Sequence, residues 1–363
     1  MKNMNEIRGC LLGGAIGDAL GYAVEFSSES AIFAKYGEKG ITEYELCDGK
    51  AIISDDTQMT MFTACGIIHS LLSGATSNEE RIGYIYSCYI DWLITQSFFD
   101  ERSECKCWLG SIDDLFARRA PGNTCLNSLM SGVCGNTAVR INHSKGCGGV
   151  RRVAPIGLYF GGLMSQDDID KLGAEAAAIT HGHELGFVPA AALVHIVSKL
   201  AFFECDSIAK AVDSAIEAVE RLFGDYDIEG TTVTLLRKAK ELAASDVPTL
   251  EAIHTLGAGW VGEEALAIAV YCALKFEDDF EAAVCAAVNH GGDSDSTGAI
   301  CGNIVGALVG LSGLPRKYLE RLELREEILE LSDDLYYTRL LTPDEFLGGD
   351  KQREKYKSCI YKG

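Results

Sequence analysis

Apolar residues recur at three- and four-residue intervals along most of the chain, which is the spacing of one face of an α-helix. The pattern is clear at 169–182 (IDKLGAEAAAITHG), 207–224 (SIAKAVDSAIEAVERLFG) and 263–276 (EEALAIAVYCALKF). Strict alternation of apolar and polar residues, which indicates a half-buried strand, is scarce. The pattern therefore predicts an all-α fold with short connections.

The helical pattern continues without a low-complexity linker, a repeat of fixed period or a shift in composition. We therefore expect a single compact many-helix domain over residues 5–335, followed by a C-terminal extension at 336–363. Two longer segments, 27–54 and 97–125, are predicted to be loops. Long loops of compact helical domains often carry a functional site, so both are candidates for one.

Two of the predicted helices carry a glycine at every fourth position. The first stripe is Gly9, Gly13, Gly17 and Gly21, and the second is Gly298, Gly302, Gly306 and Gly310. A glycine inside a helix is less stable than alanine by roughly 0.5–1 kcal/mol, so another interaction must offset the loss. Residues four apart form a packing ridge. We therefore expect close approach of helix backbones along these stripes.

The second stripe has an alternative interpretation as a membrane span. Residues 297–314 (TGAICGNIVGALVGLSGL) carry no charge and have small residues at every fourth position. However, the segment contains the polar residue Asn303, and acidic residues immediately precede it. A buried central helix explains the same residues, so we expect no membrane association.

The excess of acidic over basic side chains limits which molecules the protein can bind. The 363 residues include 32 basic and 53 acidic side chains, which gives a formal net charge of −21. Nucleic-acid binding depends on Lys and Arg against phosphate, so general nucleic-acid binding is disfavoured. The apolar fraction of 47% is enough for a sizeable buried core. An anionic ligand would need a locally favourable site.

The fourteen cysteines suggest disulfides or a metal site, but their context favours neither. Residues 1–10 lack the basic and then apolar pattern of a signal peptide, and no C-x-x-C spacing occurs. Cys105 and Cys107 have no histidine near them in the sequence, so a structural zinc site is poorly supported. We expect free thiols packed as small apolar groups in a cytoplasmic protein.

Two short segments combine acidic and hydroxyl residues at the start of a predicted helix. They are SDDT at 54–57 and GGDSDST at 291–297. Helix capping explains one such cluster, because Ser and Asp satisfy free N–H groups at a helix start. Two clusters supply more carboxylates than caps require. If the glycine stripes bring these helix ends together, the repulsion between the carboxylates would need a cation.

The donor types indicate which cation would bind. Carboxylate and hydroxyl oxygens without Cys or His select a hard metal, Mg²⁺ or Mn²⁺, over zinc or copper. Four carboxylates are enough for two ions. Ser294 and Thr297 are interpreted as turn and cap residues rather than ligands.

Several motifs together resemble the ADP-ribosylglycohydrolase family, which includes dinitrogenase-reductase-activating glycohydrolase and ADP-ribosylhydrolases. The resemblance runs from about residue 5 to residue 312, in the family's order. Its motifs are GCLLGGAIGDALGYAVEF (9–26), SDDTQM (54–59), GCGGVRRVAPIG (146–157), THGH (180–183), GWVGEEALAIA (259–269) and GGDSDSTGAICGNIVGA (291–307).

The resemblance implies an all-α single-domain fold with two divalent cations, Mg²⁺ or Mn²⁺, and cleavage of the glycosidic bond between ADP-ribose and an acceptor. The implied metal ligands are Ser54, Asp55, Asp56, Asp293, Asp295 and Ser296. The implied catalytic residues are Glu25, Asp55 and Asp56. Glu25 resembles an acidic residue near the reacting ribose, where it would act as base, acid or charge stabiliser. A surface glutamate at a helix end is the alternative.

The resemblance also implies a set of substrate-binding residues: Gly146, Cys147, Gly148, Gly149, Arg152, His181 and Asn123. The glycine-rich segment would offer backbone N–H groups to the diphosphate. A tight turn without a ligand is the alternative there, and a structural histidine is the alternative for His181. The chain departs from the family at Arg151, where methionine is expected, and at Ser54 and Ser296, where threonine is common.

Two other functions remain open at this point. The first is a non-catalytic relative that binds ADP-ribose, and the second is a dinuclear phosphoesterase that cuts the pyrophosphate. The substrate expected from the resemblance is an ADP-ribosylated protein side chain or a small ADP-ribose conjugate. The sequence does not choose between arginine, serine, nucleobase and O-acetyl linkages.

Overall fold

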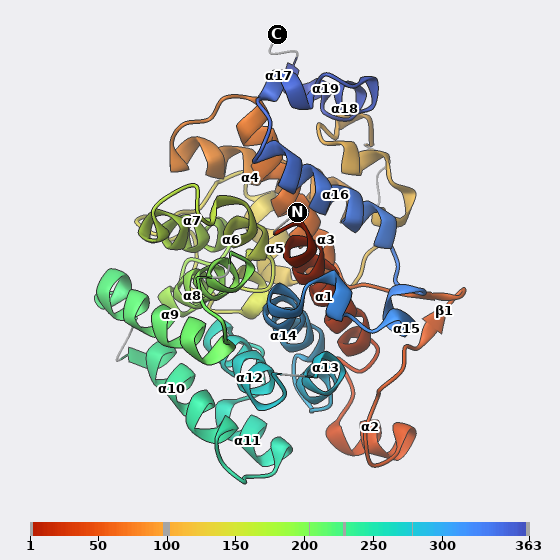
Figure 1. Cartoon of the computed structure of the whole chain (residues 1–363), viewed down its shortest axis with the longest axis vertical. Coiled ribbons are helices and arrows are strands. Elements are labelled where there is room, and N and C mark those ends of the chain that lie inside the picture. Colours follow the sequence, from red (N-terminus) through yellow and green to blue (C-terminus); the bar gives the residue numbers. More distant parts are fainter. Residues whose placement is uncertain (1–2, 97–101, 203, 228–229, 278, 361–363) are drawn as a thin grey trace.

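The computed structural model describes residues 3–96, 102–202, 204–227, 230–277 and 279–360, and this part of the chain is built almost entirely from helices (Figure 1). The N-terminal half contains α1 (Met4–Tyr22), α2 (Glu29–Tyr36), α3 (Asp55–Leu72), α4 (Asn78–Gln96), α5 (Asn123–Met130), α6 (Ala154–Phe160) and α7 (Gln166–Ala178). The central part contains α8 (Glu184–Ala201), α9 (Ile208–Phe223), α10 (Thr231–Ala243), α11 (Thr249–Leu256) and α12 (Gly262–Lys275). The C-terminal part contains α13 (Phe280–Val288), α14 (Ser294–Val309), α15 (Arg316–Leu319), α16 (Arg325–Thr338), α17 (Pro343–Phe346), α18 (Asp350–Lys355) and α19 (Lys357–Ile360). The predicted all-α fold is confirmed.

Helices α1 and α14 lie side by side at the centre of the molecule (Figure 1). A Cβ added at Gly17 would lie 2.0 Å from the carbonyl oxygen of Gly298, and one added at Gly302 would lie 2.0 Å from that of Gly13. Gly9 and Gly306 meet in the same way. The two stripes therefore face each other, and backbone contact offsets the low helix propensity of glycine, as the sequence predicts.

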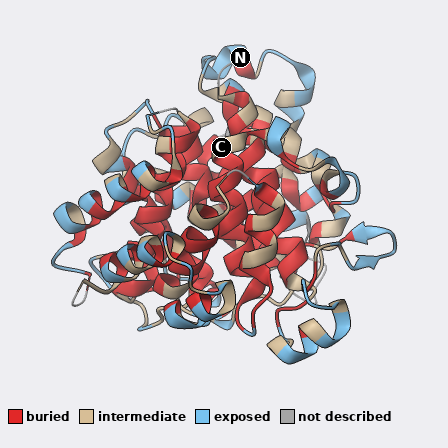
Figure 2. Ribbon diagram, turned by 60° about the horizontal axis from the view of Figure 1, so that its bottom comes forward, coloured by how far each residue is buried: buried red, intermediate tan, exposed pale blue. Residues whose placement is uncertain are grey.

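Buried residues fill the interior, and exposed residues lie at the periphery (Figure 2). α14 is buried over nearly its whole length, which explains the apolar segment for which a membrane span was the alternative. Among the described helices, α8 alone is long and apolar enough to cross a membrane, but 94% of it is buried inside the protein. Its apolarity therefore reflects its position in the core.

The two segments predicted to be loops contain short elements. Residues 27–54 include α2 and an antiparallel pair of strands, β1 (Leu46–Cys47) and β2 (Lys50–Ala51). Within 97–125, the described residues form 3₁₀ turns at Arg102–Glu104, Trp108–Ser111 and Asp113–Leu115 before α5 begins. Both predictions were therefore only partly correct, because local turns give no long-range periodicity to detect.

The residues predicted to form a C-terminal extension pack against the domain. The predicted boundary at 335/336 falls inside α16. Tyr356 is fully buried, and its hydroxyl donates to Asp334 Oδ2 at 2.7 Å. α16 itself packs against α1 and α3. This C-terminal segment is thus continuous with the helical core.

Candidate functional site

The two acidic and hydroxyl clusters lie at the N-termini of α3 and α14. Ser54 caps α3, because its Oγ accepts a hydrogen bond from the Asp56 backbone N–H at 3.2 Å. Asp293 caps α14 and accepts from the Ser296 N–H at 3.3 Å. Thr297 donates to the Asp293 carbonyl at 2.8 Å. Capping is therefore correct for one residue of each cluster, and it leaves the other carboxylates to be explained.

Arg151 joins the two clusters. Its guanidinium forms ion pairs with Asp55 and Asp56, and its Nη1 donates to Ser296 Oγ at 3.2 Å. Burial raises the pKa of Asp55 and Asp56, Arg151 lowers it, and the charge of Asp295 raises it further. The ends of α3 and α14 thus meet in one buried region.

Glu25 belongs to the same region. One carboxylate oxygen from each of Glu25, Asp293 and Asp295 lies within 4.8 Å of the other two. Burial, followed by the charges of Asp295 and Asp293, raises the pKa of Glu25 to about 9. Burial and Asp295 also hold the pKa of Asp293 well above its usual range. Glu25 is therefore part of the cluster rather than a surface residue.

Asp18, to which no sequence motif assigned a role, supports the first cluster. Its carboxylate accepts hydrogen bonds from the backbone N–H groups of Ser54 (3.0 Å) and Thr57 (3.1 Å), and from the Thr57 hydroxyl (2.5 Å). Burial and the charge of Asp295 raise its pKa to about 7. The available signal was an acidic residue directly after Gly17 in the glycine stripe of α1, because a buried carboxylate needs partners.

The cluster fits hard divalent cations. Among the described residues, several of its buried carboxylate oxygens have no hydrogen-bond partner, and a buried orphan acceptor is costly. They are Glu25 Oε2, Asp55 Oδ1, Asp56 Oδ2 and Asp295 Oδ2. All of the donors are oxygen, the type that Mg²⁺ and Mn²⁺ prefer. Arg151 supplies a positive charge on the Asp55 and Asp56 side, so the carboxylates there are partly neutralised already.

The glycine-rich segment 146–149 adjoins this cluster. Cys147 Sγ donates to Asp293 Oδ2 at 2.8 Å. A Cβ added at Gly148 would lie 3.1 Å from His181 Cε1, and one added at Gly149 would lie 2.7 Å from the Gly186 carbonyl oxygen. Tight packing therefore accounts for these two glycines. Burial, followed by the charges of Arg152 and Arg151, lowers the pKa of His181 well below its usual range, so the imidazole is neutral.

Two predicted substrate-binding side chains lie in different surroundings. Arg152 is fully buried: its guanidinium donates to Thr180 Oγ1 at 2.7 Å and lies over the Tyr89 ring at 4.4 Å. These contacts are internal, so its side chain supports the core. Asn123 is exposed at the start of α5. Its neighbour Gly122 is the residue that reaches the cluster, donating its N–H to Asp55 Oδ2 at 3.3 Å.

An exposed aromatic pair borders the cluster. Phe26 follows Glu25 directly, and its ring stacks on that of Trp260 with centroids 6.5 Å apart and an interplanar angle of 23°. The Trp260 carbonyl accepts the Cys147 N–H at 3.3 Å, which ties the pair to the glycine-rich segment. The two side chains are 76% and 45% exposed. They give the site an apolar edge that no motif in the sequence predicted.

The fold and the cluster define a class: an all-helical protein with a buried carboxylate site suited to hard divalent cations. The ADP-ribosylglycohydrolase family model matches residues 2–344, and the chain belongs to this family. An uncharacterized protein of Archaeoglobus fulgidus is 29% identical over 91% of this chain and 96% of its own length. ADP-ribosylhydrolase ARH3 of Mus musculus is 23% identical over 92% of each chain.

A solved structure agrees with this assignment at the level of the fold. It is an ADP-ribosylglycohydrolase-related protein complex, and it superposes with a TM-score of 0.57 over 93% of this chain and 99% of its own. The identity is 22%. The resemblance predicted from the motifs is therefore confirmed over nearly the whole chain.

Proposed function

We propose that the protein is a divalent-cation-dependent hydrolase that cleaves the glycosidic bond between ADP-ribose and an acceptor, either a protein side chain or a small conjugate. Family membership supports hydrolysis of ADP-ribose linkages. The single observation that carries the proposal further is the convergence of five carboxylates from three parts of the chain. They are Glu25, Asp55, Asp56, Asp293 and Asp295.

The proposed cations are Mg²⁺ or Mn²⁺. Their proposed ligands are Ser54, Asp55, Asp56, Asp293, Asp295 and Ser296. When bound, such ions supply electrostatic stabilisation and orient ribose hydroxyls and water. Asp18 has a positioning role in this scheme, because it holds the backbone of Ser54 and Thr57 in place.

Glu25 is proposed as the proton-transfer group. Cleavage at the anomeric carbon develops oxocarbenium character and requires a proton to reach the leaving group. Its carboxyl group is next to Asp293 and Asp295, and its raised pKa lets it hold a proton near neutral pH. A group that holds a proton in one step and accepts one in another suits this reaction.

Three features are proposed to bind the rest of the substrate. The turn at 146–149 offers backbone N–H groups without bulky side chains, and Arg151, whose guanidinium is paired with Asp55 and Asp56, reduces the negative charge of the region where an anion would bind. The stacked rings of Phe26 and Trp260 present an apolar face on which a nucleobase can pack. Together they match the anionic diphosphate and the aromatic base of ADP-ribose.

Glu25→Gln tests the proposed proton transfer. We expect the variant to bind Mn²⁺ as the wild type does, measured by calorimetry, and to lose about 10²–10⁴-fold in kcat, the usual contribution of general acid–base catalysis. Glu263→Gln is a matched control, because Glu263 is a buried glutamate that pairs with Lys145, at 2.7 Å. Full activity of Glu25→Gln with unchanged metal binding would remove Glu25 from the mechanism.

A further inference from the structure

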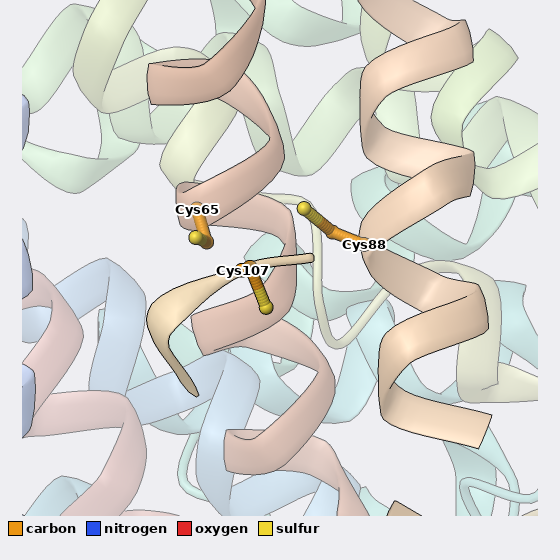
Figure 3. Close-up of side chains that lie close together, drawn as sticks. All are labelled: Cys65, Cys88 and Cys107. Atoms are coloured by element: carbon orange, nitrogen blue, oxygen red, sulfur yellow. The ribbon is translucent and has the colours of Figure 1, made fainter. Parts of the chain in front are cut away.

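Three cysteines that are far apart in the sequence meet in the interior (Figure 3). Cys65 belongs to α3, Cys88 to α4, and Cys107 to the segment just before the 3₁₀ turn Trp108–Ser111. Their three Sγ atoms lie within 4.8 Å of one another. The residues are only 0%, 2% and 4% exposed. No sequence spacing pointed to this group, because each member comes from a different element.

Close packing of α3 and α4 fixes the first two thiols. A Cβ added at Gly66 would lie 2.7 Å from the Ile85 Cα, so the helices touch one residue after Cys65 and one turn before Cys88. Close packing therefore requires a glycine at position 66, as it does at the glycine stripes of α1 and α14. The two thiols face each other across a rigid contact between helices.

Asp91 fixes the third thiol. Its carboxylate, one turn after Cys88 on α4, accepts the backbone N–H groups of Lys106 at 2.9 Å and Cys107 at 2.7 Å. The same helix therefore carries one thiol and anchors the segment that carries another. A ligand set held in this way is preorganised, which is what a binding site requires.

A buried histidine lies near the thiols, although its ring nitrogens are not within 4.8 Å of all three Sγ atoms. His69 follows Cys65 by four residues, so it lies on the same face of α3. Its Nε2 is buried without a hydrogen-bond partner among the described residues. The Cys107 thiol acts electrostatically on the imidazole. His69 also lines a groove of about 400 Å³ with Lys106 and Ser358.

We propose that Cys65, Cys88 and Cys107 form a structural Zn²⁺ site, with His69 or a water molecule as the fourth ligand. Thiolates select soft or borderline ions over Mg²⁺ and Mn²⁺, and three Cys with one His is an established zinc donor set. Tetrahedral Zn–S bonds of about 2.3 Å place sulfur atoms about 3.8 Å apart, which the observed limit of 4.8 Å accommodates.

The charges support zinc over a monovalent ion. Burial raises the pKa of the Cys65 and Cys107 thiols, so the metal-free site holds neutral thiols. Binding of Zn²⁺ releases one proton from each of the three thiols and leaves one net negative charge. A monovalent ion such as Cu⁺ would leave two net negative charges in the same buried space, where uncompensated charge is costly.

This site is separate from the carboxylate cluster and does not depend on the proposed function. Cys65 lies about 15 Å along α3 from Asp55, at about 1.5 Å per residue. The ion would fasten the segment around Cys107 to α3 and α4. That segment leads to Gly122, whose N–H contacts Asp55. The zinc site therefore stabilises the loop that borders the carboxylates and takes no part in the reaction.

Metal analysis of the purified full chain tests the proposal. We expect one zinc per chain after expression with zinc and washing with excess Mg²⁺, measured by inductively coupled plasma mass spectrometry. Cys65→Ser, Cys88→Ser and Cys107→Ser should each lose it, whereas Cys272→Ser, a buried thiol of α12, should retain it. Absence of zinc from the wild type would overturn the proposal. Zinc that disappears in Asp295→Ala but persists in the cysteine variants would do the same, because it would lie at the carboxylates.

Measurements on the wild-type protein test the zinc site even if the cysteine variants fail to fold. Co²⁺ added to the reduced, metal-free protein should produce sulfur-to-cobalt charge-transfer absorption, and His69→Ala should alter its visible bands if the imidazole is the fourth ligand. Zn²⁺ should also protect Cys65, Cys88 and Cys107, but not the exposed Cys47, from alkylation in mild urea. Unchanged alkylation of the three thiols and no charge-transfer band would show that they are ordinary core residues.

Discussion

Arg151 and Asp55 form a buried ion pair at the centre of the carboxylate cluster, and Asp56 contacts the same guanidinium. This arginine is where the family resemblance predicts methionine. Its pKa stays well above the usual value because both carboxylates outweigh the effect of burial. The chain thus carries a permanent cation of its own beside the proposed metal ligands.

Replacing this cation by the residue that the resemblance predicts should make the protein depend on metal for stability. In Arg151→Met, Asp55 and Asp56 lose their partner, and breaking a buried ion pair costs about 3–5 kcal/mol. Without divalent cations, we expect the free energy of unfolding, measured by urea titration, to fall by this amount. Addition of Mn²⁺ should restore most of that free energy. Arg8→Met is the control: its pair with Asp333 is partly exposed (29% and 30%) and should contribute about 0–1 kcal/mol. Equal losses in the two variants would contradict this role of Arg151.

The stability of the metal-free protein should fall as the pH rises. Burial raises the pKa of Asp18 to about 7, of Glu25 to about 9 and of Asp55 to about 6, against ordinary values of 3.8, 4.5 and 3.8. The folded state therefore retains protons that the unfolded state has lost, and its free energy of unfolding decreases between about pH 4 and pH 9. Urea unfolding with a chelator, compared at about pH 5 and pH 8, measures the slope. With a divalent cation bound, the free energy of unfolding should instead increase with pH. A metal-free protein that is more stable at the higher pH would contradict the raised pKa values of these carboxyl groups.

Asp18→Asn should lower activity through the position of the first cluster. The carboxylate accepts hydrogen bonds from two backbone N–H groups and from the Thr57 hydroxyl, whereas an amide would place a donor against one of them. An unsatisfied buried group costs about 1–3 kcal/mol, and we expect weaker Mn²⁺ binding together with lower kcat. Asp213→Asn, at an exposed ion pair with Lys240, is the control. Unchanged Mn²⁺ affinity in Asp18→Asn would show that Asp18 has no positioning role.

Gly17→Ala should destabilise the protein, because the added Cβ meets the Gly298 carbonyl oxygen at 2.0 Å. Overpacking of this kind costs about 1–3 kcal/mol, and displacement of α14 should also reduce metal binding. Gly83→Ala is a matched control in α4, because nothing lies within 4 Å of the added Cβ. It should stabilise the protein by about 0.5–1 kcal/mol. Thermal unfolding of both variants checks the contrast, and similar shifts in the same direction would contradict close packing of α1 and α14.

Much of the fold and part of the site were predictable because their signals repeat along the chain. The helical period identified the elements, and the stripes that contain Gly17 and Gly298 predicted which two helices meet. Once these helices are paired, the carboxylates that precede α14 must lie near the residues around α1. Asp55 begins α3, which carries no glycine stripe, so its convergence with Asp295 was predicted by the family resemblance and not by that packing rule.

The remaining features depend on contacts between single residues. Nothing near Arg151 in the sequence shows that its side chain reaches Asp55, while the adjacent Arg152 turns into the core beside Tyr89. The grouping of Cys65 with Cys107 likewise depends on tertiary packing, which local spacing does not encode. The carboxyl cluster was predictable in outline, but its internal cation and the thiol group were not.

The central claim is cleavage of an ADP-ribosyl bond at the carboxylate cluster. The most direct test incubates the purified protein with arginine-, serine- and O-acetyl-linked ADP-ribose, with Mg²⁺, Mn²⁺ or a chelator, and identifies the products by mass spectrometry. We predict release of intact ADP-ribose from at least one linkage, only with a divalent cation, and loss of that activity in Asp295→Asn and Asp56→Asn. Formation of AMP and ribose phosphate, or no release from any linkage while the cations are bound, would contradict it.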